Sequence, residues 1–342
     1  MRIMTIKTNV LIIGSGVGGL GSAAWCKERG LNFCVVDAAK ELPKNLHNGV
    51  HYLHSIPELP FDSNIKKITL TDGVLLKNGE IVHQPSLTHS LEYSEKVREI
   101  QHPSSILDIG KDSSVYMPEN NSLNSLITQM YEFAIPLNFY FGWRLVSVDI
   151  IKKTSRFFST TENREDLYVE FDSIISTAPL NKVGEIFGLS NLPELKANPV
   201  YTTNYKVERI VPNWMINLYV PDIESPIYRA SILNGICSVE SIRPLTDIEM
   251  LGIVPKLLKM FHLVGGFPEE AHWETGKVMS ISIDDRAKIV DELKKRDVYS
   301  VGRFGLHNRK LLVDTTINQS HSIVDYLWSC TGWEGCKQLL IK

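Results

Sequence analysis

Glycines spaced as in a phosphate-binding loop occur near the N-terminus, in the stretch NVLIIGSGVGGLGSAAWC. Gly14, Gly16 and Gly19 form the pattern GxGxxG directly after an apolar segment. In such a loop the first glycine permits a tight turn, the second lets the backbone approach a pyrophosphate, and the third allows close helix packing. The N-terminus of a following helix adds unpaired N–H groups and partial positive charge. The spacing therefore predicts a pyrophosphate site.

A carboxylate follows where a ribose-binding residue is expected. Asp37 ends the apolar segment LNFCVVDA, at the separation of about 20 residues that is typical of dinucleotide-binding units. Its carboxylate is able to accept a hydrogen bond from a ribose 2′-hydroxyl, whereas a 2′-phosphate would be repelled. FAD or NAD is therefore expected rather than NADP. The alternative interpretation is a glycine-rich turn in a sheet that binds no nucleotide.

Three elements must position these residues. The pattern predicts a strand over 9–13, a helix from about 17 to 29 and a second buried strand over 32–37. A membrane span would need about 20 continuous apolar residues, and the glycines interrupt this run. The start also resembles a secretory signal, but the helix and the second buried strand that follow, ending in Asp37, argue against one. The strand–turn–helix–strand order instead favours a nucleotide-binding unit.

Length, composition and charge limit the number of domains and the kinds of partner that the chain is expected to have. The chain has 342 residues, of which 43% are hydrophobic and 22% charged, and a net charge of −3. Its length favours two domains, or one large domain with an insertion. The charge gives no reason to expect a nucleic-acid or membrane-surface partner. The five widely spread cysteines are expected to be reduced thiols. We therefore expect a cytoplasmic protein with a small-molecule substrate and no metal site, and the oligomeric state stays open.

Further segments resemble those of a known group of proteins. NGVHYLHS, at 48–55, resembles a histidine-containing segment that passes beside the flavin ring, and VYMPENNSLNSLITQMYEFA, at 115–134, resembles the entry to a helix. The group is the FAD-dependent flavoprotein superfamily of UDP-galactopyranose mutase, the flavin amine oxidases and protoporphyrinogen oxidase. The resemblance implies that FAD is the cofactor. It makes His51 a candidate catalytic residue, and the pattern predicts a helix from about 123 to 133, capped by Ser122.

The middle and the C-terminal part of the chain carry the same resemblance. WRLVSVDI implies backbone contact with the adenine around Leu145, and EFDSIISTAPL matches a threonine-x-proline turn at Thr177. VGRFG is followed by a last helix, for which Asp314 or Thr315 is a plausible N-cap. In the resembling family the start of that helix points at the flavin pyrimidine, where its dipole stabilises negative charge.

The expected fold class is α/β, with a Rossmann-type FAD-binding domain and an α+β substrate domain that contains an antiparallel sheet. The resemblance makes the FAD-binding domain discontinuous, built from 1–56, 110–185 and 296–342. The segments 57–109 and 186–295 would form the substrate domain.

Three functions remain open. The first is an amine-oxidase-like oxidoreductase that removes a hydride from a small polar substrate at flavin N5. The second is a sugar-nucleotide mutase that uses reduced FAD as a nucleophile, and the third is a catalytically silent flavin-binding module. Arg229 in SPIYRAS resembles the mutase arginine near flavin and diphosphate, but the loop LHNRKLLVD lacks the tyrosines of the mutases. The oxidoreductase therefore ranks slightly ahead.

The candidate residues form two sets. The catalytic candidates are His51 and Arg229, and the candidate cofactor-binding residues are Gly14, Ser15, Gly16, Gly18, Gly19, Asp37, Ala38, Leu145, Thr177, Gly302, Arg303, Phe304, Asp314 and Thr315.

Overall fold

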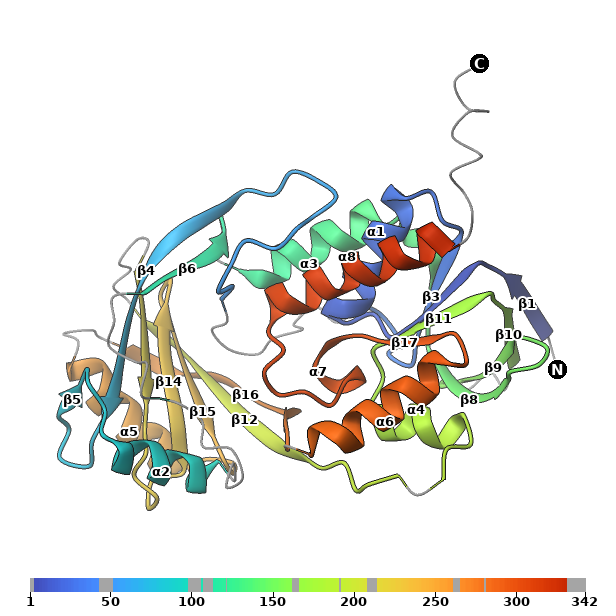
Figure 1. The fold of residues 1–342 in the computed structure, drawn as a ribbon. Coiled ribbons are helices and arrows are strands. Elements are labelled where there is room, and N and C mark those ends of the chain that lie inside the picture. Colours follow the sequence, from blue (N-terminus) through green and yellow to red (C-terminus); the bar gives the residue numbers. More distant parts are fainter. Residues whose placement is uncertain are drawn as a thin grey trace.

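The computed structural model shows two lobes that lie side by side (Figure 1). One lobe carries a large sheet, and the other carries a parallel sheet packed between layers of helices and a smaller sheet. The structure describes residues 3–42, 52–97, 106, 113–120, 122–161, 166–190, 192–207, 214–260, 265–279 and 281–330.

A five-stranded parallel sheet forms the centre of the second lobe. Its strands are buried runs of β-branched and other apolar residues, as expected where both faces are covered. The order is β17-β11-β2-β3-β7, so the chain moves outward in one direction from β2 and in the other from β11. This reversal between β2 and β11 is the place where open α/β sheets bind ligands. The strands are β2 (Val10–Ile13), β3 (Phe33–Asp37), β7 (Phe139–Phe141), β11 (Ser173–Ser176) and β17 (Val298–Ser300).

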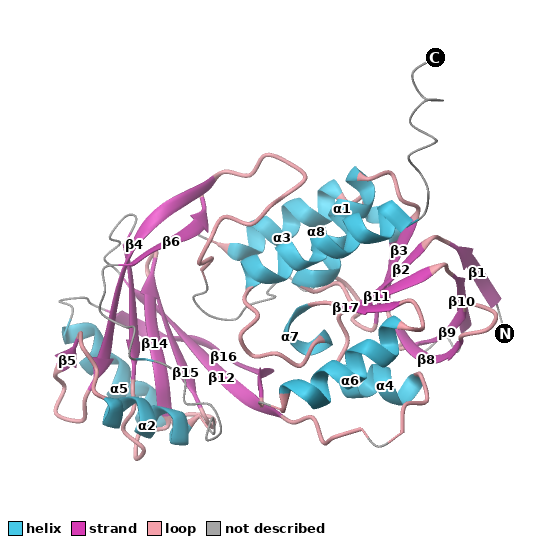
Figure 2. Ribbon diagram, in the orientation of Figure 1, coloured by secondary structure: helices cyan, strands magenta, loops and turns pink. Residues whose placement is uncertain are grey.

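Three helices cover one face of this sheet, and they lie together in Figure 2. They pack through an apolar cluster to which Leu20 of the first helix, Met130 of the second and Ile317 of the third contribute. The helices are α1 (Val17–Glu28), α3 (Leu123–Phe133) and α8 (Val313–Cys330).

A four-stranded sheet and two helices cover the opposite face. The smaller sheet has the order β1-β10-β9-β8, in which β1 and β10 are parallel and the other pairs antiparallel. Its Phe157 and Leu167 pack against Leu11 and Ile174 of the parallel sheet. The elements of this layer are β1 (Ile3–Lys7), β8 (Trp143–Asp149), β9 (Thr154–Ser159), β10 (Asp166–Glu170), α4 (Leu180–Ile186) and α6 (Ile283–Lys294).

The first lobe is built on an eight-stranded, mainly antiparallel sheet. The strand order is β16-β12-β15-β14-β13-β4-β5, and β6 pairs with β4. Two helices accompany it, α2 (Leu87–Lys96) and α5 (Asp247–Met260). The strands are β4 (Ile65–Leu75), β5 (Ile81–Val82), β6 (Ser113–Pro118), β12 (Ala197–Val207), β13 (Trp214–Tyr219), β14 (Ile227–Leu233), β15 (Ile236–Ser241) and β16 (Gly265–Val278).

The expected α/β architecture with parallel and antiparallel sheets is confirmed, as is a helix over 123–133 whose N-cap Ser122 accepts a hydrogen bond from the Asn124 N–H. The last helix begins at Val313 rather than after a cap at Asp314 or Thr315, so both residues lie in its first turn. The division of the chain into an FAD-binding and a substrate domain stays a prediction. Among the described helices, none combines the length and apolar character that crossing a membrane requires.

Candidate cofactor and substrate site

The glycine loop lies at the point where the strand order reverses. Gly14 follows β2 with a φ of +96°, a left-handed conformation that favours glycine. Thr177 follows β11, and its hydroxyl donates to the Ile13 carbonyl at 2.9 Å. A Cβ on Gly14 would lie 2.2 Å from the Thr177 hydroxyl oxygen. The turn and the threonine are therefore packed together, and Gly14 has no room for a side chain.

Two further glycines are required by packing within the chain. A Cβ on Gly19 would lie 1.9 Å from the Gly14 carbonyl oxygen, and one on Gly18 would lie 2.8 Å from a methyl group of Val301. These contacts let α1 approach β2 and the turn that follows β17. They agree with the packing role expected of the third glycine of the motif.

Gly16 is different, because nothing in the protein requires a glycine there. Its φ of −69° and ψ of −175° are open to any residue. No heavy atom lies within 4 Å of the position that its Cβ would take. The backbone at the start of α1 is therefore left open on this side. Gly16 also provides no side-chain cap for α1, and the first turn of the helix holds no acidic residue.

The N-termini of α1 and α8 lie side by side at the carboxyl edge of the parallel sheet. Gly18 in the first turn of α1 lies against Thr316 in the first turn of α8, and Arg29 beyond the end of α1 pairs with Asp325 near the end of α8 at 2.6 Å. The helices therefore run parallel. Both present their partial positive charge at the carboxyl edge of the sheet, where an anion would be stabilised.

Asp37 lies next to the glycine loop. One of its oxygens accepts hydrogen bonds from the backbone N–H and the hydroxyl of Ser15, the latter at 2.6 Å, and the other accepts from the Ala39 N–H at 2.7 Å. The Ala38 carbonyl accepts from the Thr160 hydroxyl at 3.2 Å. The structure thus brings Asp37, Ala38 and Ser15 together at the end of β3.

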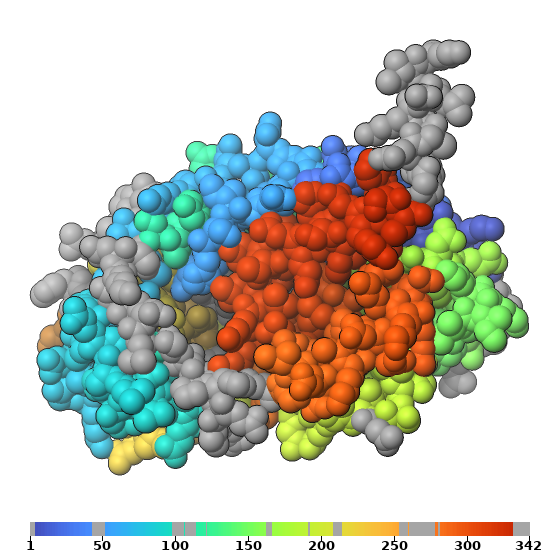
Figure 3. All heavy atoms as spheres, viewed as in Figure 1, coloured from blue at the N-terminus to red at the C-terminus, as the bar shows by residue number. Residues whose placement is uncertain are grey.

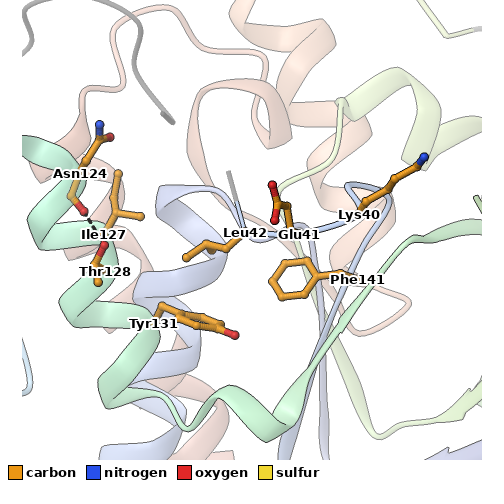
Figure 4. A pocket seen from close by; sticks show the side chains of 8 residues that line it. All are labelled: Lys40, Glu41, Leu42, Asn124, Ile127, Thr128, Tyr131 and Phe141. Atoms are coloured by element: carbon orange, nitrogen blue, oxygen red, sulfur yellow. Dashed lines mark hydrogen bonds between the residues drawn. The ribbon is translucent and has the colours of Figure 1, made fainter. Parts of the chain in front are cut away.

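A pocket of about 470 Å³ opens beside the loop after β3 (Figure 4). Leu42 and Phe141 line it from the sheet side, and Tyr131 from α3. Its volume falls in the range of about 300–1,000 Å³ that is usual for small-molecule sites. The other lining residues are Lys40, Glu41, Asn124, Ile127 and Thr128. Leu145, the expected adenine contact, lies in β8 opposite Phe157 and packs in the cluster on the other face of the sheet.

The Gly-Arg-Phe-Gly segment forms the short helix α7 (Gly302–Gly305) directly after β17. The Gly302 N–H donates to the Gln319 side chain at 3.0 Å, and a Cβ on Gly305 would lie 2.7 Å from the Ser176 carbonyl oxygen. Arg303 donates through Nε to the Leu311 carbonyl at 3.3 Å, which ties the turn to the loop before α8. The partly buried Phe304 follows in the same turn.

The start of α8 is joined to the segment that enters the first lobe. Asp314 is 1% exposed, and one carboxylate oxygen accepts hydrogen bonds from the backbone N–H and hydroxyl of Ser55, at 2.8 and 2.7 Å. Its other oxygen is buried with no partner among the described residues. Thr315 accepts from the Leu312 N–H at 2.8 Å. Asp314 therefore serves a link between segments, which explains why it does not cap the helix.

His51 lies outside the described residues, but the chain directly after it is described. Leu53 exchanges two backbone hydrogen bonds with Tyr116 of β6, each of 2.9 Å, and so joins the large sheet. Tyr52 and His54 flank Leu53 along the chain, and their ring centroids lie 4.9 Å apart. The segment 52–55 thus runs from the large sheet to the start of α8. Figure 3 shows a hollow between the two lobes, next to this light-blue segment and the red loop before α8.

Arg229 lies on β14 in an ion pair. Its guanidinium contacts Glu240 of β15, which also accepts a hydrogen bond from the Tyr228 hydroxyl at 2.5 Å. Glu240 is 6% exposed. The positive charge of Arg229 is therefore offset inside the protein, while its Nε has no partner among the described residues. Burial raises the pKa of Tyr228, so its phenol stays protonated near neutral pH.

A second carboxylate lies on the same face of the sheet. Asp72 of β4 stands opposite Asn217 of β13, and Tyr219 of β13 stands opposite Arg229. Burial raises the pKa of Asp72, and Asn217 and Arg229 lower it in part. Tyr52 is close enough to Asp72, Tyr219 and Arg229 for their charges to affect its own pKa, which burial raises. Within this group the carboxylates of Asp72 and Glu240 outnumber the one guanidinium.

Only Arg229 of this cluster was identified from sequence. Asp72 lies in a strand of the large sheet far from Arg229 along the chain, and it belongs to none of the segments that carry the resemblance. Strand pairing through β13 brings Asp72 and Arg229 together. The alternation of apolar and polar residues in each strand is the one sequence signal that could have indicated that they share a face of the sheet.

Comparisons with known proteins identify the fold. No family model and no curated protein matches the sequence. Among solved structures, the chain is similar to reduced UDP-galactopyranose mutase, with a TM-score of 0.65 and 15% identity over 94% of this chain and 96% of that one. A redesigned putrescine oxidase gives a TM-score of 0.56 and 9% identity over 95% and 100%. Aklavinone-11 hydroxylase, solved with FAD and aklavinone, gives 0.57 and 12% over 96% and 63%. The fold is that of the FAD-dependent flavoproteins.

Proposed function

We propose that this chain is a flavoenzyme that holds FAD across the carboxyl edge of its parallel sheet. The observation that carries the proposal is the open backbone at Gly16, at the start of a helix with no cap of its own. A pyrophosphate there would accept hydrogen bonds from the first N–H groups of α1. Gly14 and Thr177 hold this loop at the reversal of strand order.

The surrounding residues fit the rest of such a cofactor. Asp37 already accepts from Ser15 and Ala39, but a carboxylate offers about four acceptor sites and so retains capacity for a ribose hydroxyl. The start of α8, which is parallel to α1, would place positive potential beside the flavin ring. When bound, FAD supplies hydride transfer at N5, and the protein supplies orientation and electrostatics.

The substrate side favours an oxidoreductase that acts on a small polar molecule, and specifically on an amine. Asp72 and Glu240 give the cluster on the large sheet an excess of negative charge over Arg229. The phenol rings of Tyr52 and Tyr219 add faces that attract a cation. An ammonium group would therefore be bound by Asp72 and the two tyrosines. The ion pair of Arg229 with Glu240 would fix the neighbouring strands β14 and β15 beside it.

A sugar-nucleotide mutase is the second candidate. It is favoured by similarity to reduced UDP-galactopyranose mutase along nearly the whole of both chains. The offset charge of Arg229 weighs against it, because a diphosphate needs an arginine free to form bidentate hydrogen bonds. A catalytically silent flavin-binding module is the remaining alternative.

Anaerobic spectroscopy separates these functions. FAD-loaded protein is mixed with a panel of primary amines, and bleaching of the flavin absorbance is the result expected of an oxidoreductase. Asp72→Asn should weaken the amine response at least tenfold, while the matched variant Asp62→Asn, which changes an exposed carboxylate, should respond as the parent does. Conversion of UDP-galactopyranose by the reduced protein would instead establish the mutase. A bound flavin that responds to neither would leave the silent module.

A further inference from the structure

A second pocket lies away from the glycine loop, where the loop after α7 meets the start of α6. It has a volume of about 140 Å³. Three of its lining side chains carry a positive charge, and none carries a negative one. The lining residues are Ile281, Ile283, Arg286, His307, Asn308, Arg309 and Lys310.

Two of the cations are not neutralised by neighbouring acids. Arg286 of α6 and Lys310 of the loop have no ion-pair partner among the described residues. The nearest acids along the chain are engaged elsewhere or turned to solvent, since Asp285 pairs with Lys288 at 3.7 Å and Asp284 is exposed. Cations that converge on one pocket repel one another, so the arrangement favours a bound anion.

The loop that carries these residues is held in a fixed conformation. The Asn308 N–H donates to the Arg303 carbonyl at 2.9 Å, and the Asn308 side chain accepts from the Lys310 N–H at 3.1 Å. Arg303 in turn donates to the Leu311 carbonyl. A loop held in this way presents its cations without a large loss of conformational entropy on binding.

A buried histidine lines the same pocket. His307 is 6% exposed and adopts a φ of +44°, which is unusual for a residue other than glycine. Its ring bonds to the backbone of Met279, and Nε2 is left without a partner among the described residues. Burial, with a contribution from Arg286, lowers its pKa and keeps the ring neutral. Because the neutral ring uses its one N–H on the Met279 backbone, Nε2 is an acceptor. A protonated oxygen of a ligand in the pocket, such as the P–OH of hydrogen phosphate, would give this buried atom the partner that it lacks among the described residues.

We infer that this pocket binds a small oxyanion, such as the phosphate or carboxylate group of a ligand, between Arg286 and the loop that carries Lys310. Planar guanidinium donors match the oxygens of both groups, and the pocket is large enough for one such group but not for a nucleotide. The site is separate from the proposed FAD site, and it requires neither the cofactor nor the proposed reaction.

Calorimetric titration with inorganic phosphate and, separately, with malonate tests the inference. The protein is first saturated with FAD, so that phosphate has no access to the glycine loop, and the titration is repeated without FAD. Binding of either anion that weakens as sodium chloride is raised is the expected result. The anion that binds more tightly identifies the source of the oxyanion.

Single substitutions locate the site. Arg286→Gln and Lys310→Gln should each weaken binding by about tenfold or more, as expected for the loss of a charged hydrogen bond. Arg144→Gln removes the same charge from an exposed position on β8 and should bind as the parent does. The exposed Lys310 keeps the test usable if Arg286→Gln fails to fold. Absence of binding by the parent, or equal binding by all variants, would overturn the inference.

Discussion

Replacement of Gly16 by alanine separates a glycine kept for a ligand from glycines kept for packing. The backbone at Gly16 accepts any residue, and its Cβ would enter open space. Alanine is a poorer N-cap than glycine by up to about 1 kcal/mol, but it restricts the unfolded chain by about 0.4–1 kcal/mol. The two effects nearly cancel, so the free energy of unfolding without FAD should change by less than about 0.5 kcal/mol.

FAD binding should respond much more strongly. The new methyl group would hold the pyrophosphate away from the first N–H groups of α1, at a cost of about 1.5–3 kcal/mol for one charged hydrogen bond. This corresponds to roughly a tenfold to hundredfold rise in the dissociation constant, measured by quenching of FAD fluorescence. Gly19→Ala is the contrasting variant, because its Cβ would lie 1.9 Å from the Gly14 carbonyl oxygen. It should lose about 1–3 kcal/mol of stability before any ligand is added. Unchanged FAD affinity in a folded Gly16→Ala protein would show that the open backbone at Gly16 does not hold a pyrophosphate.

Three further predictions concern single residues. Lys96→Met should lower the free energy of unfolding by about 2–4 kcal/mol in urea titrations. The reason is that the buried Nζ of Lys96 donates to the carbonyls of Val220, Asp222 and Ile227. A loss below about 0.5 kcal/mol would show that these carbonyls find other donors. Hydrogen bonds from Arg243 and from the Thr246 N–H lower the pKa of Glu249 to about 2 from 4.5. The ionised Glu249 therefore stabilises the folded protein above pH 4.5, and this stabilisation is lost as the pH falls towards 2. Its magnitude is about 1 kcal/mol or less, as expected for a partly exposed pair. Glu249→Gln should flatten stability between those two values, and an unaltered pH profile would contradict the assignment. Asp37→Asn should weaken FAD binding about tenfold, and equal affinity would remove Asp37 from the ribose site.

The nucleotide-binding unit could be predicted because it is local. A glycine turn, a helix and a buried strand each leave a clear pattern over a few neighbouring residues. The expected helix from about 17 to 29 therefore matches α1, and the expected strand over 32–37 matches β3, within a residue or two. The start of α8 was placed too late because Asp314 has the chemistry of a cap but is bonded to Ser55. That partner is distant along the chain, and no local pattern reveals it.

The cluster around Asp72 and Arg229 and the cationic pocket could not be predicted for a related reason. Asp72 and Arg229 meet only through the pairing of β4, β13 and β14, and register between distant strands is set by the tertiary fold. Lys96 likewise reads as a polar residue at the end of a helix. Its three acceptors belong to a hairpin far along the chain, so its burial became evident only in the folded structure.

Retention of FAD by the purified protein shows whether this chain is a flavoprotein. The protein is incubated with excess FAD, passed through a desalting column, and its visible spectrum is recorded before and after denaturation. We predict that flavin absorbance elutes with the folded protein at one FAD per chain, and that denaturation releases it. Protein that elutes folded and without flavin absorbance would show that the chain does not hold FAD.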